Sequence, residues 1–346
     1  MPKKVGVPRA LLYYKFDVLW KTYFEKLGAE LIISPESNSS IKKLAVTNAP
    51  DEDCYSTKLY FGHTLSLKDK VDFLFIPRFQ SDHKTNISCP KFMGLADVLR
   101  SMFKDLPPII RPYFSMAKKH HRMRHLLWKA FKVGYIFTRN PFRIVYASIE
   151  ALKKHSQFYR KLHLTEKQLQ LWEQNLISFR HGGNRIPVIE EYGNISSPEK
   201  IKIALAGHSY VLNDKFQSLD IAGKILQHGA EYITSEQIPR TIVEAEMAKL
   251  DFNMYFQYER EILGTIMYFL DSKTVDGIIH VMIFSCGPDS VAGEMASRIA
   301  HLKQDVPLLQ LTFDELTGEA GLNTRLEAFF DMIIRKKEKK QPVVFH

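Results

Sequence analysis

Apolar residues recur at helical spacing from about residue 10 to residue 27, between two short apolar runs at residues 5–8 and 29–35, the second of which we expect to be a buried strand. A helix between two strands is typical of a parallel sheet, because parallel strands need a crossover connection. Short apolar runs at 71–77 and 107–112 predict two more strands, and helical spacing follows residues 54 and 91. The first third of the chain is therefore predicted to be α/β, with Gly28 ending its first helix.

The pattern changes between residues 116 and 180. Apolar and polar residues do not alternate there as they do in strands, and single apolar residues are separated by Lys, Arg, Gln and Glu. We predict a helical connector or insertion there. Gly- and Ser-rich loops at 182–184 and 196–198 mark its end.

The α/β pattern returns near residue 200. Apolar runs at 200–208, 231–234, 278–284 and 307–312 predict strands, and helices are expected around 220–228, 291–301 and 325–330. The run at 278–284 is the most apolar and should be a buried strand. We predict an N-terminal α/β lobe at 1–115, a helical connector at 116–195 and a C-terminal α/β lobe at 196–346.

Composition narrows the class of protein. The chain has 346 residues, is 45% hydrophobic and carries a formal net charge of +10. No apolar run approaches membrane-spanning length and no leader pattern precedes the first strand, so a cytoplasmic protein without a membrane partner is expected. The charge suits an acidic partner, a phosphate-bearing ligand such as coenzyme A, or nucleic acid; the last is disfavoured because no base-stacking or groove-entry motif is present.

The three cysteines, Cys54, Cys89 and Cys286, each stand where a strand or loop leads into a helix. An odd number at scattered spacing argues against a disulfide framework. Helix N-termini stabilise thiolates, and three converging thiolates would make an iron-sulfur site. The alternatives are zinc, which thiolates also bind, and three buried thiols that only fill space.

Several strings appear in the order typical of one family. They are Val-Gly-Val-Pro-Arg-Ala from Val5, the segment from Cys54 to His63, Ile76-Pro77-Arg78, Cys89-Pro-Lys-Phe-Met-Gly94, Ala206-Gly-His-Ser-Tyr210, Phe284-Ser-Cys-Gly-Pro-Asp-Ser290 and the acidic loop from Phe313 to Gly321. With them the chain resembles the acyl-CoA dehydratase activase-related proteins. These are similar to the iron-sulfur subunits of 2-hydroxyacyl-CoA dehydratases and benzoyl-CoA reductases and to double-cubane cluster proteins.

This resemblance implies two Rossmann-like parallel-sheet lobes and a 4Fe-4S cluster on Cys54, Cys89 and Cys286, with the fourth iron open. It also implies that a separate ATP-hydrolysing activator of the actin and sugar-kinase type supplies low-potential electrons. The implied role is electron transfer or reduction in anaerobic metabolism, with a CoA thioester as substrate. This chain has no P-loop of its own. A double-cubane cluster would need two chains to share the site, in a homodimer or in a heterodimer with a related cluster subunit. The alternative is a non-catalytic accessory protein of a dehydratase system, stabilised by a cluster or by zinc.

Four further residues are weaker candidates for the site: Lys58, Lys91, His208 and Ser209. The two lysines follow cysteines closely and could screen cluster charge or contact an anionic substrate; they could equally be solvated. His208 and Ser209 end a predicted strand and could face the cleft between the lobes, or only cap a helix.

The remaining polar groups have structural interpretations. The acidic residues at 51–53 and Asp289 are expected to cap the helices that follow. Asp314, Glu315 and Glu319 form an acidic loop that could contact the activator or be solvated. The group His120, His121 and His125 is expected on a solvated helix face, and residues 255–259 could serve a dimer contact or a core helix.

Overall fold

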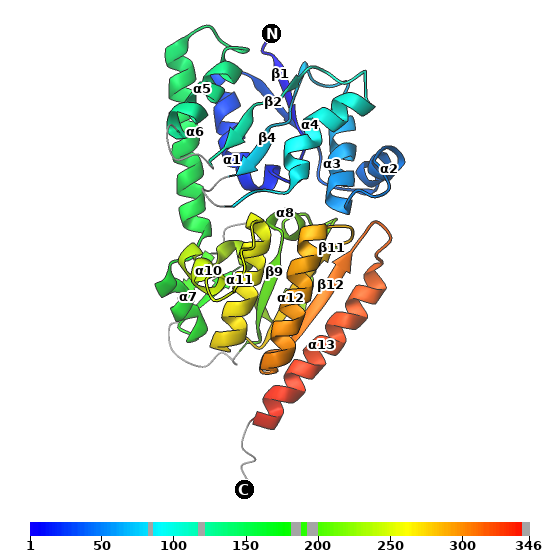
Figure 1. The fold of residues 1–346 in the computed structure, drawn as a ribbon, viewed down its shortest axis with the longest axis vertical. Helices are drawn as coiled ribbons and strands as arrows, with labels where there is room; N and C mark the ends of the chain where they lie inside the picture. The colour runs from blue at the N-terminus through cyan, green and yellow to red at the C-terminus, as the bar shows by residue number, and fades with distance from the viewer. Residues whose placement is uncertain (82–85, 117–121, 181–187, 192–199, 341–346) are drawn as a thin grey trace.

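The computed structural model describes residues 1–81, 86–116, 122–180, 188–191 and 200–340, and it has two lobes stacked along the long axis (Figure 1). Each lobe contains a four-stranded parallel sheet. The strand order is β2-β1-β3-β5 in the first lobe and β10-β9-β11-β12 in the second, so the first strand of each lobe lies between its second and its third. The predicted fold class, two Rossmann-like parallel-sheet lobes, is confirmed.

The strands of the two large sheets are short and mostly apolar. They are β1 (Lys4–Val7), β2 (Glu30–Ile33), β3 (Phe73–Phe75) and β5 (Ile109–Ile110) in the first lobe, and β9 (Lys202–Gly207), β10 (Glu231–Thr234), β11 (Gly277–Ile283) and β12 (Leu308–Phe313) in the second. Two small sheets pair β4 (Arg78–Ser81) with β6 (Tyr113–Ser115) and β7 (Ile177–Arg180) with β8 (Val188–Glu191).

Helices cover both faces of the sheets and connect the lobes. They are α1 (Tyr13–Leu27), α2 (Ser39–Asn48), α3 (Tyr55–Leu65), α4 (Pro90–Met102), α5 (Arg122–Gly134), α6 (Pro141–Leu162), α7 (Glu166–Glu173), α8 (Ser209–Leu212), α9 (Ile221–Gln227), α10 (Arg240–Met247), α11 (Gln257–Ser272), α12 (Gly287–Lys303) and α13 (Glu319–Lys340). A 3₁₀ turn, η1, spans Ser235–Gln237.

The first lobe agrees with most of the sequence predictions. Helix α1 ends at Gly28, whose φ of 78° is the left-handed conformation that glycine adopts without a steric penalty. Strand β2, expected to be buried, is instead a partly exposed edge strand. Helix α2 was not predicted, although Asn38 caps it by accepting hydrogen bonds from two backbone N–H groups.

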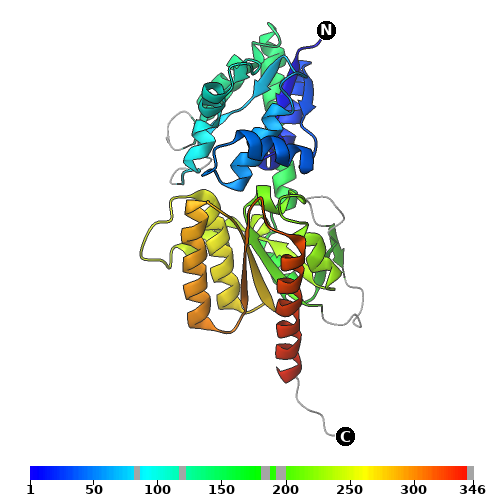
Figure 2. The ribbon, with the colours of Figure 1, turned by 90° about the vertical axis from the view of Figure 1, so that its right-hand side faces the viewer.

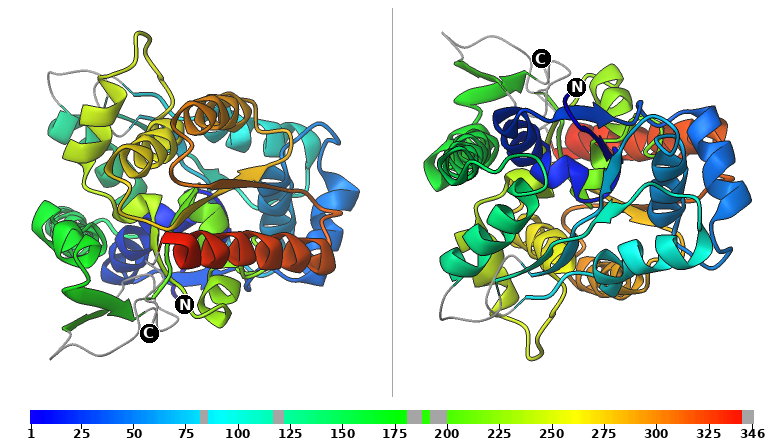
Figure 3. Two further views of the ribbon diagram at one scale, coloured as in Figure 1. Left: turned by 90° about the horizontal axis from the view of Figure 1, so that it is seen from below. Right: turned by 90° about the horizontal axis from the view of Figure 1, so that it is seen from above.

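The second lobe shows the two-residue periodicity of a buried strand. Ile203 and Leu205 of β9 pack in the core shared with α9 and α13, whereas Ala204 and Ala206 pack in the core formed with α11 and α12. Viewed from below, α13 therefore lies on one side of the sheet and α11 and α12 lie on the other (Figure 3). The predicted buried strand at 278–284 is confirmed as β11, at the centre of this sheet.

The helical middle of the chain connects the lobes. The long helix α6 packs along α1 and continues down to the second lobe, beside which α7 lies (Figure 1). The prediction that no strand occurs between residues 116 and 180 is wrong, because β7 forms an antiparallel pair with β8. The Gly-rich loop at 182–184 and the Ser-rich loop at 196–198 lie outside the described residues. In the part of the chain that is described, no helix is long and apolar enough to cross a bilayer.

The two lobes, seen from the side in Figure 2, are joined by buried polar groups. Asp214, which follows α8, accepts hydrogen bonds from the Ser37 hydroxyl and from the backbone N–H groups of Phe216 and Gln217, the last two at 3.1 Å. Ser37 also contacts His63 Nε2 at 2.9 Å. Because these groups are almost fully buried and come from both lobes, their hydrogen bonds fix how the lobes meet.

Candidate functional site

The strand order places a binding site at the edge where the lobes meet. In sheets of this order the connections leave to opposite sides between the first and third strands, and ligands bind beyond the carboxyl ends of those two strands. In the second lobe these strands are β9 and β11. His208 directly follows β9, and Cys286 follows β11.

Each cysteine is the N-cap residue of a helix: Cys54 precedes α3, Cys89 precedes α4 and Cys286 precedes α12. None of the three helices has a side-chain cap. The backbone N–H groups of Lys91 and Asp289 lie near the sulfurs of Cys89 and Cys286 and act to lower the pKa of these thiols. The prediction that the cysteines stand at helix N-termini is confirmed.

The prediction that the acidic residues at 51–53 cap α3 is wrong. Asp53 forms an ion pair with Lys91, two residues beyond Cys89. The backbone oxygen of Glu52 accepts a hydrogen bond from the Ser285 hydroxyl at 2.8 Å. These contacts tie the segment before Cys54 to the segments that carry the other two cysteines.

A third link holds the Cys89 segment against the second lobe. Ile87 and Phe256 form a parallel β-bridge, in which Ile87 N–H donates to Tyr255 O at 2.9 Å and Gln257 N–H donates to Ile87 O at 3.1 Å. The three cysteine segments, more than 30 and nearly 200 residues apart along the chain, are thus connected to one another by short contacts.

The thiols influence one another electrostatically. Burial raises the pKa of Cys89 to about 11, with further contributions from the charges of Cys54 and Glu259. Burial and the charges of Asp289, Cys54 and Glu259 raise the pKa of Cys286 far above the ordinary value of a thiol. Without a cation these thiols remain protonated at neutral pH, so they are poor nucleophiles. A metal would supply the positive charge that their thiolate forms require.

A buried charge cluster lies behind Cys286, which is 9% exposed. His208 Nε2 lies 3.3 Å from Glu259 Oε1, and His208 Nδ1 lies 3.6 Å from Asp289 Oδ2. Burial opposes protonation of His208, but the carboxylates of Asp289 and Glu259 outweigh it and raise its pKa. One ligand atom each from His208, Cys286 and Asp289 lies within 4.8 Å of the others, a grouping that could hold a metal ion.

The role predicted for Asp289 is also corrected. Its carboxylate caps no N–H group of α12; it contacts His280 Nε2 at 3.2 Å and accepts the Ile283 N–H at 3.3 Å. Sequence reasoning missed Glu259 and His280. The signal for His280 was its position inside the most apolar strand, where a polar residue needs a buried partner.

The two lysine candidates are both held in ion pairs, and Lys58 is buried. Lys58 is 6% exposed and its Nζ lies 2.6 Å from Glu315 Oε1, across the two lobes. Lys91 is held by Asp53, and burial lowers its pKa. Glu315 therefore belongs to the junction, whereas Glu319 pairs with Lys224 at 2.5 Å and Asp314 bonds the Thr317 hydroxyl within its own loop.

The other predicted candidates differ in burial and in location. Ser209, 2% exposed, lies in the floor of a cavity between the lobes. The segment at 255–259 is split, with Tyr255 59% exposed and Tyr258 and Glu259 buried. His125 is half-buried beside an apolar cavity and not on a solvated face; His120 and His121 lie outside the described residues.

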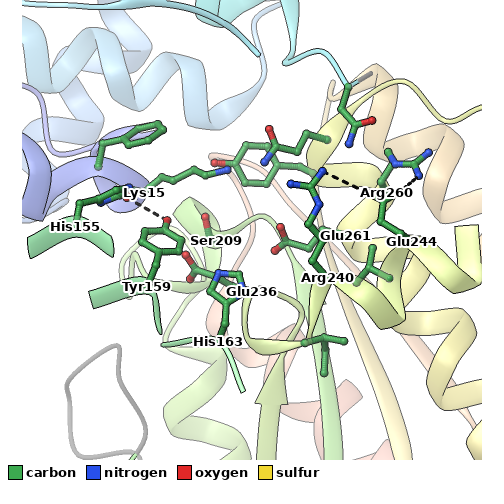
Figure 4. Close-up of a pocket in the computed structure, with 16 residues that line it drawn as sticks. Lys15, His155, Tyr159, His163, Ser209, Glu236, Arg240, Glu244, Arg260 and Glu261 are labelled. Carbon is green, nitrogen blue, oxygen red and sulfur yellow. Dashed lines mark hydrogen bonds and ion pairs between the residues drawn. The ribbon is translucent and has the colours of Figure 1, made fainter. Parts of the chain in front are cut away.

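The cavity between the lobes has a volume of about 290 Å³ and is rich in charged side chains (Figure 4). Lys15 reaches into it from α1, His163 from the end of α6, and Arg240 from α10. Burial and the charges of Lys15 and Arg240 lower the pKa of His163 to about 4. Three glutamates, Glu236, Glu244 and Glu261, also line the cavity, so it presents both signs of charge. The ring of Tyr258, 5.4 Å from the His208 ring between centroids, separates the cavity from the charge cluster.

The donor set fits a thiolate-held metal group. Three thiols at uncapped helix N-termini provide soft ligands, and backbone N–H groups directed at sulfur are the contacts that tune iron-sulfur clusters. The described residues around the cysteines also provide nitrogen and carboxylate donors, His208 and Asp289, which a single zinc ion would accept.

Two family models match the chain. Residues 4–238 match the CoA enzyme activase uncharacterised domain, and residues 157–333 match the 2-hydroxyglutaryl-CoA dehydratase D-component. A search of curated proteins finds no match. Each model covers at least half of the chain, and together they span both lobes and all three cysteines. The chain therefore belongs to the acyl-CoA dehydratase-related family that these two models describe.

Proposed function

We propose that this protein is the iron-sulfur component of a 2-hydroxyacyl-CoA dehydratase-type system, with a cluster held by Cys54, Cys89 and Cys286. The observation that carries the proposal is the convergence of three uncapped helix N-termini, each with a cysteine at its N-cap, on one edge of the lobe junction. A 4Fe-4S cluster bound there would supply one-electron transfer and, at an iron without a protein thiolate, a Lewis-acid position.

The surrounding residues have distinct roles in this proposal. The N–H groups of Lys91 and Asp289 would stabilise the thiolate forms of Cys89 and Cys286, and the Asp53–Lys91 ion pair keeps two of the cysteine segments together. Lys91 also places a cation near Cys286, whose negative charge acts on it. Such charges stabilise an anionic cluster against the low dielectric of the junction.

The cavity between the lobes provides space for a substrate, and its cations Lys15 and Arg240 could contact an anionic part. It lies directly behind Tyr258 and Ser209, and Lys15 Nζ stands 5.4 Å from the centre of the Tyr258 ring. We propose that an acyl-CoA thioester or its acid enters here. The low-potential electron would come from a separate ATP-hydrolysing activator, because the chain has no phosphate-binding loop of its own.

A second candidate function is favoured by the grouping of His208, Cys286 and Asp289. Glu259 contacts His208 Nε2, so Nδ1 remains the nitrogen directed at Cys286 and Asp289, and a carboxylate behind a histidine is the usual support of a metal-binding imidazole. A zinc ion at this position would make the protein a metal-stabilised accessory of the dehydratase system, without electron transfer.

One preparation distinguishes the two functions. Protein purified without oxygen should be brown, contain about four irons and four sulfides per chain, and give the electron paramagnetic resonance signal of a reduced cluster. Cys54→Ala, Cys89→Ala and Cys286→Ala should each lower the iron content to below about one per chain. Ser297→Ala, on α12 away from its N-terminus, is the matched control and should keep the iron.

The zinc alternative predicts another pattern. Colourless protein with one zinc per chain that is lost in His208→Gln and retained in Cys54→Ala would reject the cluster and support the accessory role. Under the cluster proposal His208→Gln keeps the iron and changes only the resonance spectrum.

A further inference from the structure

The outer face of the α5–α6 hairpin exposes large apolar side chains. We define the α5–α6 face by its exposed members, which are Trp128, Tyr135, Phe142, Val145, Tyr146 and Ile149. Phe142 is 84% exposed, an extreme value for a phenylalanine. Single exposed apolar residues are ordinary, but a contiguous group marks an interaction site.

The spacing on α6 makes four members of the group contiguous. Phe142, Val145, Tyr146 and Ile149 recur at intervals of three and four residues, so they lie on one side of the helix. The opposite side is also apolar: Ile144, Ala147 and Ala151 are buried in the core that includes α1. A helix that is apolar on two sides is normally covered on both.

The same hairpin carries almost all of the net charge of the protein. Residues 122–162 include ten lysines and arginines and one acidic residue, Glu150, which gives +9 of the +10 for the whole chain. The charge is therefore concentrated on one part of the molecule.

Cations stand directly over the exposed rings. Lys132 Nζ lies 3.8 Å from the centre of the Trp128 ring, and the Arg139 guanidinium lies 4.7 Å from that of Tyr135. Aromatic rings and cations that are interleaved in this way suit a surface with apolar side chains among carboxylates.

We infer that the α5–α6 face is the docking surface for an acidic partner protein, whose apolar side chains cover the α6 stripe and whose carboxylates meet the surrounding lysines and arginines. The inference goes beyond the proposed function and does not depend on the cluster. Tyrosine, tryptophan and arginine, all present here, are the residues that dominate protein-protein binding energies.

The other occupants fit less well. A second copy in a symmetric contact would bring +9 against +9. A membrane-lying helix needs an apolar stripe along its length, whereas this stripe extends about 11 Å and gives way to Lys153 and Arg160 on the same helix. Nucleic acid would use rings for stacking, and Val145 and Ile149 cannot stack on bases.

Photo-crosslinking in the native cell tests the inference with the full chain. The photoreactive amino acid p-benzoyl-phenylalanine, introduced in place of Tyr146, should crosslink to one protein at a peptide rich in aspartate and glutamate. The combined change of Lys132, Arg139 and Lys153 to glutamate should reduce the crosslink at least fivefold, because it reverses the charge of the surface. With that partner purified, Phe142→Ser should weaken binding at least tenfold.

The controls separate docking from misfolding. The same photoreactive residue at Leu302, which is 82% exposed on α12, should give no crosslink to this partner. The variants should keep the melting temperature and the iron content of the parent, so failure here is distinguishable from failure of the proposed function. Crosslinks to lipid, nucleic acid or a second copy, no crosslink, or crosslinks that survive charge reversal would overturn the inference.

Discussion

Two sides of the lobe junction use buried polar groups in opposite ways. Around Asp214 the groups satisfy one another: both carboxylate oxygens accept hydrogen bonds, and both ring nitrogens of His63 contact serine hydroxyls, Ser34 and Ser37, at 2.9 Å. Around Cys286 they do not. The Nδ1 atoms of His208 and His280 are buried without a hydrogen-bond partner within the described part of the chain, and three helix N-termini have no side-chain cap.

This difference indicates that one side of the junction stabilises the arrangement of the lobes and that the other side binds a ligand. Buried polar groups that are fully paired stabilise one arrangement of the lobes, whereas unpaired ones cost free energy unless a ligand satisfies them. We therefore expect the Asp214 side to determine stability without metal, and the cysteine side to contribute stability only when metal is bound.

The largest expected effect is on the Asp214 side. Asp214→Ala removes the acceptor that joins Ser37 to the loop after α8, and it should lower the free energy of unfolding of the metal-free protein by about 3–5 kcal/mol. Urea unfolding measures this. Asp251→Ala, at an exposed position of the same lobe, is the control; a loss at Asp214 no larger than at Asp251 would remove the distinction between the two sides.

The second effect depends on pH. Burial, with a smaller contribution from Arg9, lowers the pKa of His63 to about 3. Above pH 6.5 the histidine is neutral in both states and its contribution is complete; as the pH falls toward 3 the unfolded chain binds a proton that the folded chain does not, so stability decreases. His63→Gln should make this decrease shallower by about 1.4 kcal/mol per pH unit between pH 6 and pH 4. Equal slopes for the parent and the variant would contradict the neutral, buried histidine.

A third effect tests the ion pair between the lobes. Lys58 and Glu315 are partly buried, and a double-mutant cycle with Lys58→Met and Glu315→Gln should give a coupling free energy of about 1 kcal/mol. The exposed pair Arg298–Glu294 should give about 0.3 kcal/mol in the same experiment. Coupling no larger for Lys58 than for the exposed pair would mean that the lobes are not held at this point.

The smallest effect belongs to the cysteine side. In metal-free protein Cys54→Ala should change the free energy of unfolding by less than about 1 kcal/mol, because the half-buried thiol makes only a weak polar contact, with the Thr57 hydroxyl at 3.1 Å, among the described residues. With metal bound, the same substitution should cost several kcal/mol. A large loss in the metal-free protein would assign Cys54 to the fold and not to a ligand.

Much of the fold could be predicted from local patterns. Periodicity located β1, α1, β9 and β11, and glycine ended α1 where expected. Edge strands were harder to predict from the sequence, because β2 is only partly buried and β7 is four residues long. The capping roles assigned to Asp53 and Asp289 were wrong for one reason: each carboxylate found a partner distant in sequence, Lys91 and His280 respectively, and proximity along the chain does not reveal such partners.

The sequence allowed several residues of the candidate site to be predicted, but not the residues that contact them. The cysteines and His208 follow strands or loops before helices, a signal that the sequence contains. The partnership of His208 with Glu259 depends on how β9 and α11 are placed, and the concentration of charge on α5 and α6 appears only when those helices are seen to form one surface.

Anomalous diffraction at the iron edge, from crystals grown without oxygen, tests the central claim most directly. The account predicts one strong iron peak between the N-termini of α3, α4 and α12, within bonding distance of the sulfurs of Cys54, Cys89 and Cys286. Absence of iron at that position, or a lone zinc peak on His208, Cys286 and Asp289 with the other two thiols unbound, would contradict it.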